Sequence, residues 1–405
     1  YIASIIATVA LPALATIGWR VYAAFICVLF LFVFFGLHTR QGFMRIATSL
    51  RIGAPLYLLL AWVFLSPLWS IAPMTSLRAS AFLGSFLLFV IIVQAVPDQR
   101  KPRLLVTLAI AWIGTSAIYT VYMFATYGGL RIVDVGVDVN HMWGNRFANS
   151  LSLCIPVLWY AHRQRLIGGK TTALAIFAIG VIIALAQSRG GFISMAVVIT
   201  LCAAYDVLSK RRLKLSDFAL FYFVGSTAAA LVIVLLVFTT YGQGLLERLS
   251  HTDFASYWTS EDPTPTKAVS DYGRKAHMAV GIELVKNPTV LGIGYMAFGY
   301  HVEKITGMYI TSHNLLFTVL GELGFVGLIL ALSFLLTLVS RLRRGYATSR
   351  YLMPEFRALY PYLTIALFVA FLQWQWRPQH DNIIMFATIG IVLNRHSWKS
   401  LSVRL

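Results

Sequence analysis

Apolar runs of about 20 residues recur along this chain, and they restrict its fold more than any other feature. A run of this length spans the hydrocarbon core of a bilayer as a helix, which satisfies every backbone hydrogen bond within the segment. The run from Leu315 to Val339 is interrupted only by Glu322, small residues and hydroxyl side chains. Of all residues, 59% are hydrophobic and 12% charged, against roughly 25% charged in soluble domains. The sequence therefore predicts an all-α, polytopic integral membrane protein.

About twelve transmembrane helices account for these runs. We predict them at about residues 2–18, 20–37, 53–69, 77–96, 104–126, 147–161, 171–187, 191–208, 216–240, 313–339, 358–376 and 381–394. The result is one membrane domain: residues 1–240 hold transmembrane helices 1–9, residues 241–311 form a long outer loop, and residues 312–405 hold helices 10–12.

Most of the formal charge of +18 comes from basic residues whose positions set the orientation of the chain in the membrane. Basic residues near the ends of spans are retained in the cytoplasm, and most of the 33 basic residues fall in alternate connections and at the C-terminus. Both termini are therefore predicted to be cytoplasmic. Because the Lys and Arg occur in short clusters between apolar runs, we expect no nucleic-acid partner. Cys27, Cys154 and Cys202 all lie in apolar runs, so neither a disulfide nor a zinc site is expected.

The topology rule does not account for the basic residues of the opposite, outer side. Those that stand at the ends of spans are Arg78, Arg146, Arg189 and Arg377. The segment 241–311 adds others, including Arg248, Arg274 and Lys275. Its stretch DYGRKAHMAVGIELVKNP predicts an amphipathic helix ended by Asn287 and Pro288, within a partly helical cap. Gly292 and Gly294 then allow a tight turn or the close approach of a ligand.

His313 stands at the outer mouth of the span that contains Glu322. On its own the motif Ser312-His313-Asn314 can simply cap a helix. The arginines of the same face favour a site for an anion, because a guanidinium binds phosphate through a planar, permanently charged fork. A lipid-linked pyrophosphate is the natural ligand there. The outer loops hold no Asp-x-Asp pair, and we predict no metal ion and no cofactor.

Several motifs occur in an order that resembles the O-antigen ligase and polymerase superfamily. They are the loop Trp69 to Pro73 (WSxAP), the turn Ser188-Arg189-Gly190-Gly191, the pattern R…NPxxxGIG from Arg274 to Gly294, and SHNLL…GELGxxG from Ser312 to Gly327. The resemblance implies a GT-C-like, metal-independent membrane glycosyltransferase that takes a glycan from undecaprenyl pyrophosphate. With 405 residues and no large C-terminal outer domain, the chain is most similar to the ligase that joins O-antigen to the lipid A core.

The resemblance also implies roles for individual residues. His313 would be the general base that accepts a proton from the acceptor hydroxyl, and Arg189 and Arg274 would stabilise the pyrophosphate leaving group. Attack from the opposite face would invert the anomeric centre. We expect Arg78, Arg146, Arg248, Lys275 and Arg377 to contact substrate. Arg274 and Lys275 can instead form a solvated face or attract anionic lipid head groups, and Arg78, Arg146 and Arg377 can instead have a structural role. The enzyme would lie in the bacterial inner membrane, with its site facing the periplasm.

Other functions remain open on the sequence alone. An O-antigen polymerase or a protein O-oligosaccharyltransferase would use the same donor and differ in the acceptor. A lipid or glycan transporter would place its polar site near the bilayer midplane, often between two related halves, whereas the charges here gather at one face. A membrane scaffold would not need arginines and a histidine concentrated at one face. Glu322 is expected either to pair with an arginine or to stay protonated and bond to a neighbouring helix.

Overall fold

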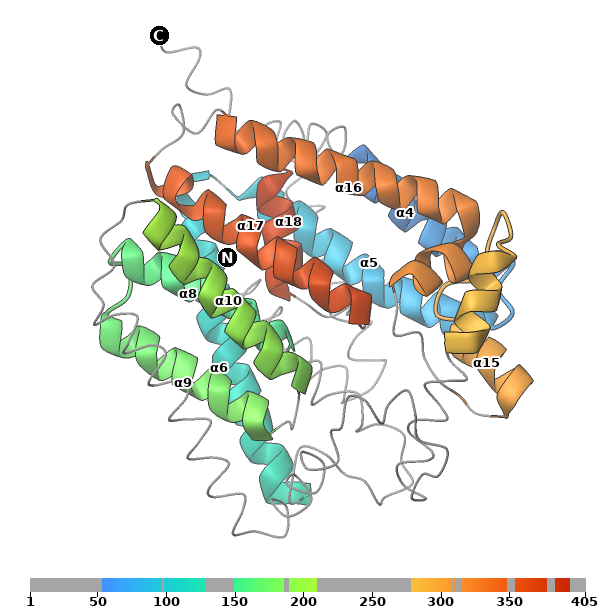
Figure 1. Ribbon diagram of the computed structural model, residues 1–405, viewed down its shortest axis with the longest axis horizontal. Helices are drawn as coiled ribbons and strands as arrows, with labels where there is room; N and C mark the ends of the chain where they lie inside the picture. The colour runs from blue at the N-terminus through green and yellow to red at the C-terminus, as the bar shows by residue number, and fades with distance from the viewer. Residues whose placement is uncertain are drawn as a thin grey trace.

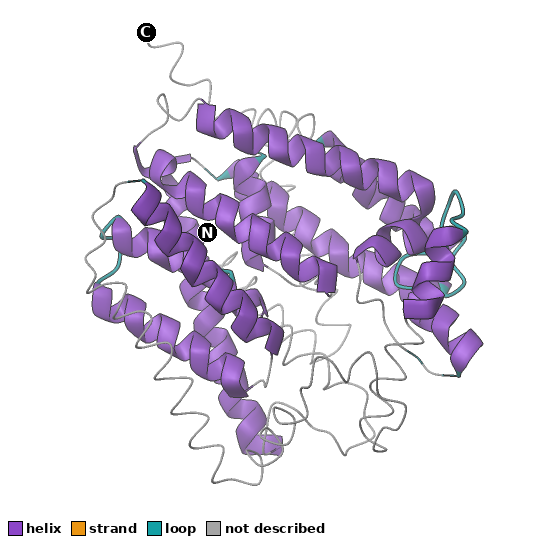
Figure 2. Ribbon diagram, viewed as in Figure 1, coloured by secondary structure: helices purple, strands orange, loops and turns teal. Residues whose placement is uncertain are grey.

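The computed structural model describes residues 53–96, 98–127, 149–185, 189–209, 278–307, 309, 315–347, 354–376 and 383–393. Within these ranges the chain forms helices and the loops that join them, with no strand (Figure 2). The prediction of an all-α fold is therefore confirmed for this part of the chain.

The helices follow the predicted order, and their bounds are as follows. They are α4 (Ala54–Leu65), η1 (Ser66–Leu68), α5 (Pro73–Ala95), η2 (Asp98–Arg100), α6 (Lys101–Tyr127), α8 (Cys154–Arg163), α9 (Gly169–Leu185), α10 (Arg189–Leu208), α15 (Phe298–Thr306), η3 (Phe317–Glu322), α16 (Leu323–Ala347), α17 (Pro354–Trp376) and α18 (Ile383–Val392). Residues 278–286 are also helical.

The helices form two groups that α18 joins (Figure 1). In one group α16 lies along α4, α4 packs on α5, and α15 lies near one end. The other group contains α6, α8, α9 and α10, with α17 packed on α8 and α10. Helix α18 contacts both α5 and α6, and its Gly390 faces Val90 and Val93 so closely that a side chain there would meet the α5 backbone. Small residues commonly permit such close helix packing in membranes.

Apolar side chains fill the centre of the bundle and also cover much of its outside. Trp159, Tyr160 and Tyr362 are fully buried. By contrast, Ile118 and Leu336 are more than two-thirds exposed on their helices, at 74% and 70%. Large apolar side chains on the outside are costly in water but suit contact with lipid tails.

Among the residues that the structure describes, two helices are long and apolar enough to cross a membrane by length and composition, at Gly191–Leu208 and Phe317–Arg344. Shorter apolar helices occupy Ala54–Leu68, Gly169–Leu185 and Arg357–Gln373. These helices support a membrane protein, while the count of twelve spans stays a prediction. The predicted spans 2–18, 20–37 and 216–240 lie outside the described residues.

Several predicted spans have bounds that differ by a few residues from those in the structure, and two differences have a clear physical reason. Helix α5 begins at Pro73 and not near residue 77, because proline fits the first turn of a helix, where its missing N–H removes no bond. Helix α16 continues to Ala347, past the predicted end at 339. The added turns carry Arg341, Arg343 and Arg344, whose long side chains can reach the membrane surface.

Candidate functional site

Three segments that carry parts of three of the four sequence motifs lie together in the structure, although the first is far from the other two in the chain. We call residues 66–76, 289–298 and 317–326 the motif junction. The N–H of Ile71 donates to the carbonyl of Ile293 at 3.1 Å, and the N–H of Ile293 donates to the carbonyl of Gly321 at 3.1 Å. The N–H of Gly294 donates to the backbone carbonyl of Glu322 at 2.9 Å. The middle segment therefore runs between the other two.

Glycines permit this close approach. Gly292 and Gly294 have φ values of 78° and 102°, which L side chains rarely adopt. A Cβ on Gly292 would overlap the backbone of Glu322 and Gly324, and one on Gly294 would overlap Ser70. The predicted tight turn is confirmed, and the group that approaches these glycines is the protein's own chain.

Two tryptophans, one on α4 and one in the loop after it, donate hydrogen bonds to backbone carbonyls of the junction. The indole N–H of Trp62 donates to the carbonyl of Leu323 at 2.9 Å, and that of Trp69 donates to the carbonyl of Leu291 at 2.9 Å. The two rings pack with their centroids 4.7 Å apart. The tryptophan of the WSxAP motif thus binds the backbone of the NPxxxGIG motif.

Serine hydroxyls satisfy the backbone of Tyr295 in the same place. Its N–H donates to Ser66 Oγ at 3.2 Å, and its carbonyl accepts from Ser76 Oγ at 2.6 Å. The hydroxyls of Ser70 and Ser76 share a further bond of 2.6 Å. Each of these serines is nearly fully buried, so their pairing removes the cost of isolated polar groups.

Glu322 lies at the centre of the junction with 1% of its surface exposed. Its Oε2 accepts the N–H of Met296 at 2.9 Å and its Oε1 accepts the N–H of Phe298 at 3.1 Å. Phe298 is the first residue of α15, where a backbone N–H has no partner within its own helix. Two kinds of partner were expected for Glu322, an arginine or a neighbouring helix. Within the described ranges Glu322 contacts no arginine. It does contact the neighbouring helix α15, whose N-terminal Phe298 donates its N–H to Glu322.

The helix that carries Glu322 is not regular. Residues Phe317–Glu322 form a π-helix, and Gly324 (φ 69°, ψ −166°) interrupts the helix directly after it. A Cβ on Gly324 would overlap the carbonyl of Val290. The predicted continuous helix over 313–339 is thus wrong at this point, because the chain must open here to receive the middle segment of the junction. Such π-helical turns occur frequently at functional sites.

An apolar cluster joins the outer segment to this π-helix. Val280, Phe298, Val302 and Phe317 are buried together, and the rings of Phe298 and Phe317 stack with centroids 6.1 Å apart. The faces are so close that a Cβ on Gly281 would overlap the Phe317 ring. The amphipathic helix predicted before Asn287 is therefore present over 278–286 and packs on the start of the Glu322 helix.

Two predicted site residues lie within the described ranges. Arg78 is exposed on α5, one turn after Thr75, whose hydroxyl donates to the Tyr300 hydroxyl of the outer segment at 3.1 Å. Arg189 is the first residue of α10. The other predicted residues, His313, Arg274, Arg146, Arg248, Lys275 and Arg377, lie outside the described residues, so the convergence of Arg189 and Arg274 stays a prediction.

Three other residues, His301, Glu303 and His141, are candidates for the base if His313 does not serve as one. His301 lies on α15, where partial burial lowers its pKa below 6.5, with Glu283 acting in the opposite direction and Lys304 in the same one. Its neighbour Glu303 is exposed, and His141 lies outside the described residues. In the part of the chain that the structure describes, no group of three His, Cys, Asp or Glu side chains could hold a metal ion.

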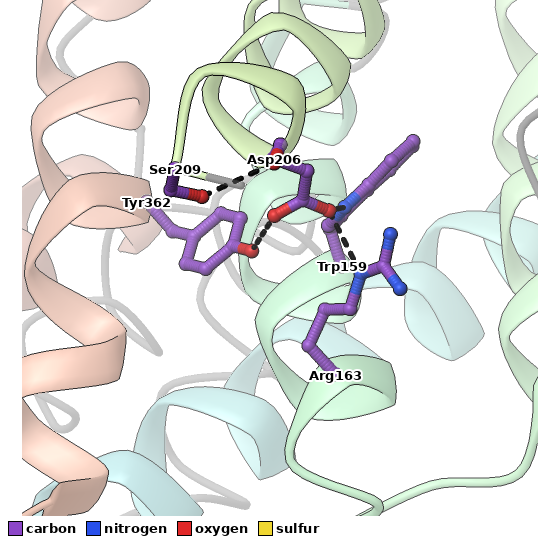
Figure 3. A network of polar contacts seen from close by, with 5 residues as sticks. All are labelled: Trp159, Arg163, Asp206, Ser209 and Tyr362. Carbon is purple, nitrogen blue, oxygen red and sulfur yellow. Dashed lines mark hydrogen bonds and ion pairs between the residues drawn. The ribbon is translucent and has the colours of Figure 1, made fainter. Parts of the chain in front are cut away.

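A second polar cluster surrounds Asp206 near the end of α10 (Figure 3). Its Oδ2 accepts from Trp159 Nε1 at 2.9 Å and from Arg163 Nε at 2.8 Å, and its Oδ1 accepts from the Tyr362 hydroxyl at 2.9 Å. Sequence reasoning missed this cluster. The available signal was a lone carboxylate near the end of the apolar run 191–208, since an ionisable group in such a run is expensive without a partner.

These observations define a class of protein: a membrane protein, helical over the described residues, in which segments of three sequence motifs are bonded together around the buried Glu322. A family model described as O-antigen ligase matches residues 173–332. This match agrees with the resemblance to the O-antigen ligase superfamily that the motifs indicated. The match includes Arg189, position 313 and two of the three junction segments, and it supports a membrane enzyme of the ligase or polymerase type. No protein of curated function matches the sequence.

Proposed function

We propose that this protein is an O-antigen ligase of the bacterial inner membrane. It transfers a polysaccharide from undecaprenyl pyrophosphate to a sugar hydroxyl of the lipid A core, at the periplasmic face and without a metal ion or cofactor. The chain crosses the membrane about twelve times with both termini in the cytoplasm, and residues 241–311 form the cap over the site.

The motif junction is the observation that carries this proposal. Helix 278–286, which follows Arg274, packs on Phe317, which follows His313. In the sequence, His313 precedes Leu315 by two positions and Arg274 precedes Met278 by four. The junction therefore supports a shared site for the two residues that the family motifs mark.

The reaction needs a base, an electrophile and a stabilised leaving group. His313 accepts the proton of the acceptor hydroxyl while its oxygen attacks the anomeric carbon. The bond from that carbon to the pyrophosphate oxygen breaks, and Arg189 and Arg274 stabilise the charge that develops on the leaving undecaprenyl pyrophosphate. Attack from the face opposite the leaving group inverts the anomeric centre. Arg78, Arg146, Arg248, Lys275 and Arg377 contribute to substrate binding.

One reconstitution tests the reaction and its closest alternatives. Purified protein in proteoliposomes receives an undecaprenyl-pyrophosphate glycan and one of three acceptors: lipid A core, a second molecule of donor, or a Ser-containing protein. Transfer to lipid A core is expected. Transfer to the second donor would instead identify a polymerase, and transfer to the protein a protein O-oligosaccharyltransferase. Movement of donor across the vesicle membrane without any glycosidic product would identify a transporter and overturn the proposal.

A further inference from the structure

We propose that Glu322 is a positioning residue of the transfer site. Its carboxyl group fixes the turn 294–298 to the helix that follows His313, and so holds the outer segment that follows Arg274 at a fixed place relative to the base. This inference rests on the proposed function for its catalytic meaning. Its structural part can be measured separately.

The burial of Glu322 indicates that its carboxyl group serves a specific purpose. Glu322 is only 1% exposed, so burying its carboxyl group costs desolvation free energy that an apolar side chain would avoid. Both carboxyl oxygens are used, one for each N–H of the same turn. Two acceptors that match two donors of a single turn fix its orientation as well as its distance.

The turn that Glu322 holds does not have a relaxed conformation. Met296 has a φ of 60°, one of two positive values among the described residues other than glycine. Such a conformation persists where surrounding contacts impose it, and it is concentrated at binding and active sites. The bond from the Met296 N–H to Glu322 Oε2 is one of those contacts.

The turn leads directly into the elements that join the outer segment to the base helix. Phe298 follows Met296 by two residues, stacks on Phe317 and packs with Val280 of helix 278–286. A change in the direction of the turn would therefore move Phe298 and, with it, the helix that begins shortly after Arg274. Glu322 lies in the same π-helix as Phe317, so one short element holds both the polar and the apolar contact.

Other bonds hold the start of the turn and the residues before it. Ser66, Ser76 and Trp69 bind the backbone of Tyr295 and Leu291. Loss of the Glu322 carboxyl group would thus leave the junction attached while releasing its end at 296–298. The expected defect is one of geometry between two parts of a site, to which catalytic rates are far more sensitive than binding.

Asp206→Asn provides a matched control for Glu322→Gln. Asp206 is also a fully buried carboxylate with partners on more than one oxygen, but it belongs to the cluster of α8, α10 and α17. We expect Glu322→Gln to lower kcat, per mole of folded protein, by about ten- to a hundredfold, with donor Kd changed by less than about threefold. Asp206→Asn should leave kcat near the wild-type value. An equal loss of kcat in both variants, or in neither, would overturn the proposal.

A distance measurement gives a readout that needs no activity. Spin labels on cysteines introduced at the exposed Lys286 and Ile329 report the position of helix 278–286 relative to α16. We expect one narrow distance distribution in the otherwise wild-type protein and in Asp206→Asn, and a broad one in Glu322→Gln. A narrow, unshifted distribution in Glu322→Gln refutes the positioning role, whether or not the protein transfers glycan to any acceptor offered.

A second variant covers the case in which Glu322→Gln does not fold. Glu322→Asp keeps both carboxyl oxygens but is shorter by one methylene, so it should lose part of the contact with the turn. Its kcat is expected between those of wild type and Glu322→Gln, with an intermediate distance distribution. Wild-type values for both measurements in Glu322→Asp would contradict the inference.

Discussion

Two buried carboxyl groups, Glu322 and Asp206, organise their surroundings in different ways. Asp206 accepts from the side chains of Trp159, Arg163 and Tyr362, which project from the α-helices α8 and α17. Glu322 accepts from the backbone of Met296 and Phe298, in a turn with an unusual conformation beside a π-helix. Irregular backbone in a membrane protein persists where protein buries it or where it lines a cavity. The difference suggests that the Asp206 cluster holds helices together and that the motif junction builds a site.

The sharpest test of this division is His313→Asn, which should remove activity without removing stability. If His313 is the base, glycan transfer falls by about two to four powers of ten while donor binding and melting temperature stay near wild type. The wild-type rate should also fall at acidic pH as the imidazole becomes protonated. The pH–rate profile of the variant's residual activity should lack this acid limb. His301→Asn is the control and should retain wild-type turnover. If instead His313→Asn turns over normally, the residue is a helix cap.

The two arginines marked by the family motifs should behave alike, although one is the first residue of α10 and the other precedes helix 278–286 in the sequence. Arg189→Ala or Arg274→Ala should each slow transfer by about two to three powers of ten, since each removes charge stabilisation worth about 3 to 4 kcal/mol. Lys should rescue only in part, because it lacks the bidentate fork. Single-turnover rates at saturating donor measure this. Normal rates in both Ala variants would exclude the arginines from leaving-group stabilisation.

Asp206→Asn should give the opposite result, a loss of stability with little loss of activity. The change takes the anion away from Arg163 and turns an amide N–H toward donors, which costs about 3 kcal/mol. A lower melting temperature in detergent is therefore expected, with kcat near wild type for the folded fraction. A large fall in kcat per folded molecule would show that the Asp206 cluster also shapes the site, and the comparison above would fail.

The smallest expected effect concerns His301 on α15. Its pKa is lowered on folding, chiefly by burial, so the unfolded chain binds the proton more tightly. Stability is therefore fully present above pH 6.5 and decreases as the pH falls from 6.5 through the folded pKa. Because the group is only partly buried, solvent screens it and the change should stay below about 1 kcal/mol. His301→Gln should remove it from a melting-temperature profile between pH 5 and 7; an unchanged profile would contradict this account.

The helices could be predicted because the bilayer leaves a long apolar run few alternatives. The motifs also located the junction segments in the sequence. What the sequence could not reveal was their contact: Trp69 and Leu291 are 222 positions apart, and nothing local identifies a carbonyl as the partner of an indole. The opening of the helix at Gly324 was missed for the same reason, since it is caused by a segment that arrives from elsewhere. Glu322 could be recognised as costly, yet its partners are backbone groups, which all residues carry.

The distance along the chain between the junction segments also determines how long the first segment waits for its partner during synthesis. At about 5 to 20 residues per second, synthesis of the 222 positions from Trp69 to Leu291 takes roughly 10 to 40 s. During this interval α4 and α5 are already made, while the backbone that Trp69 and Ser76 will bind is still missing. Hydroxyl and indole groups at the end of a helical hairpin can bond to interfacial water in the meantime. The polar loop between α4 and α5 thus stays hydrated until the segment 289–298, which is synthesised much later, binds to it.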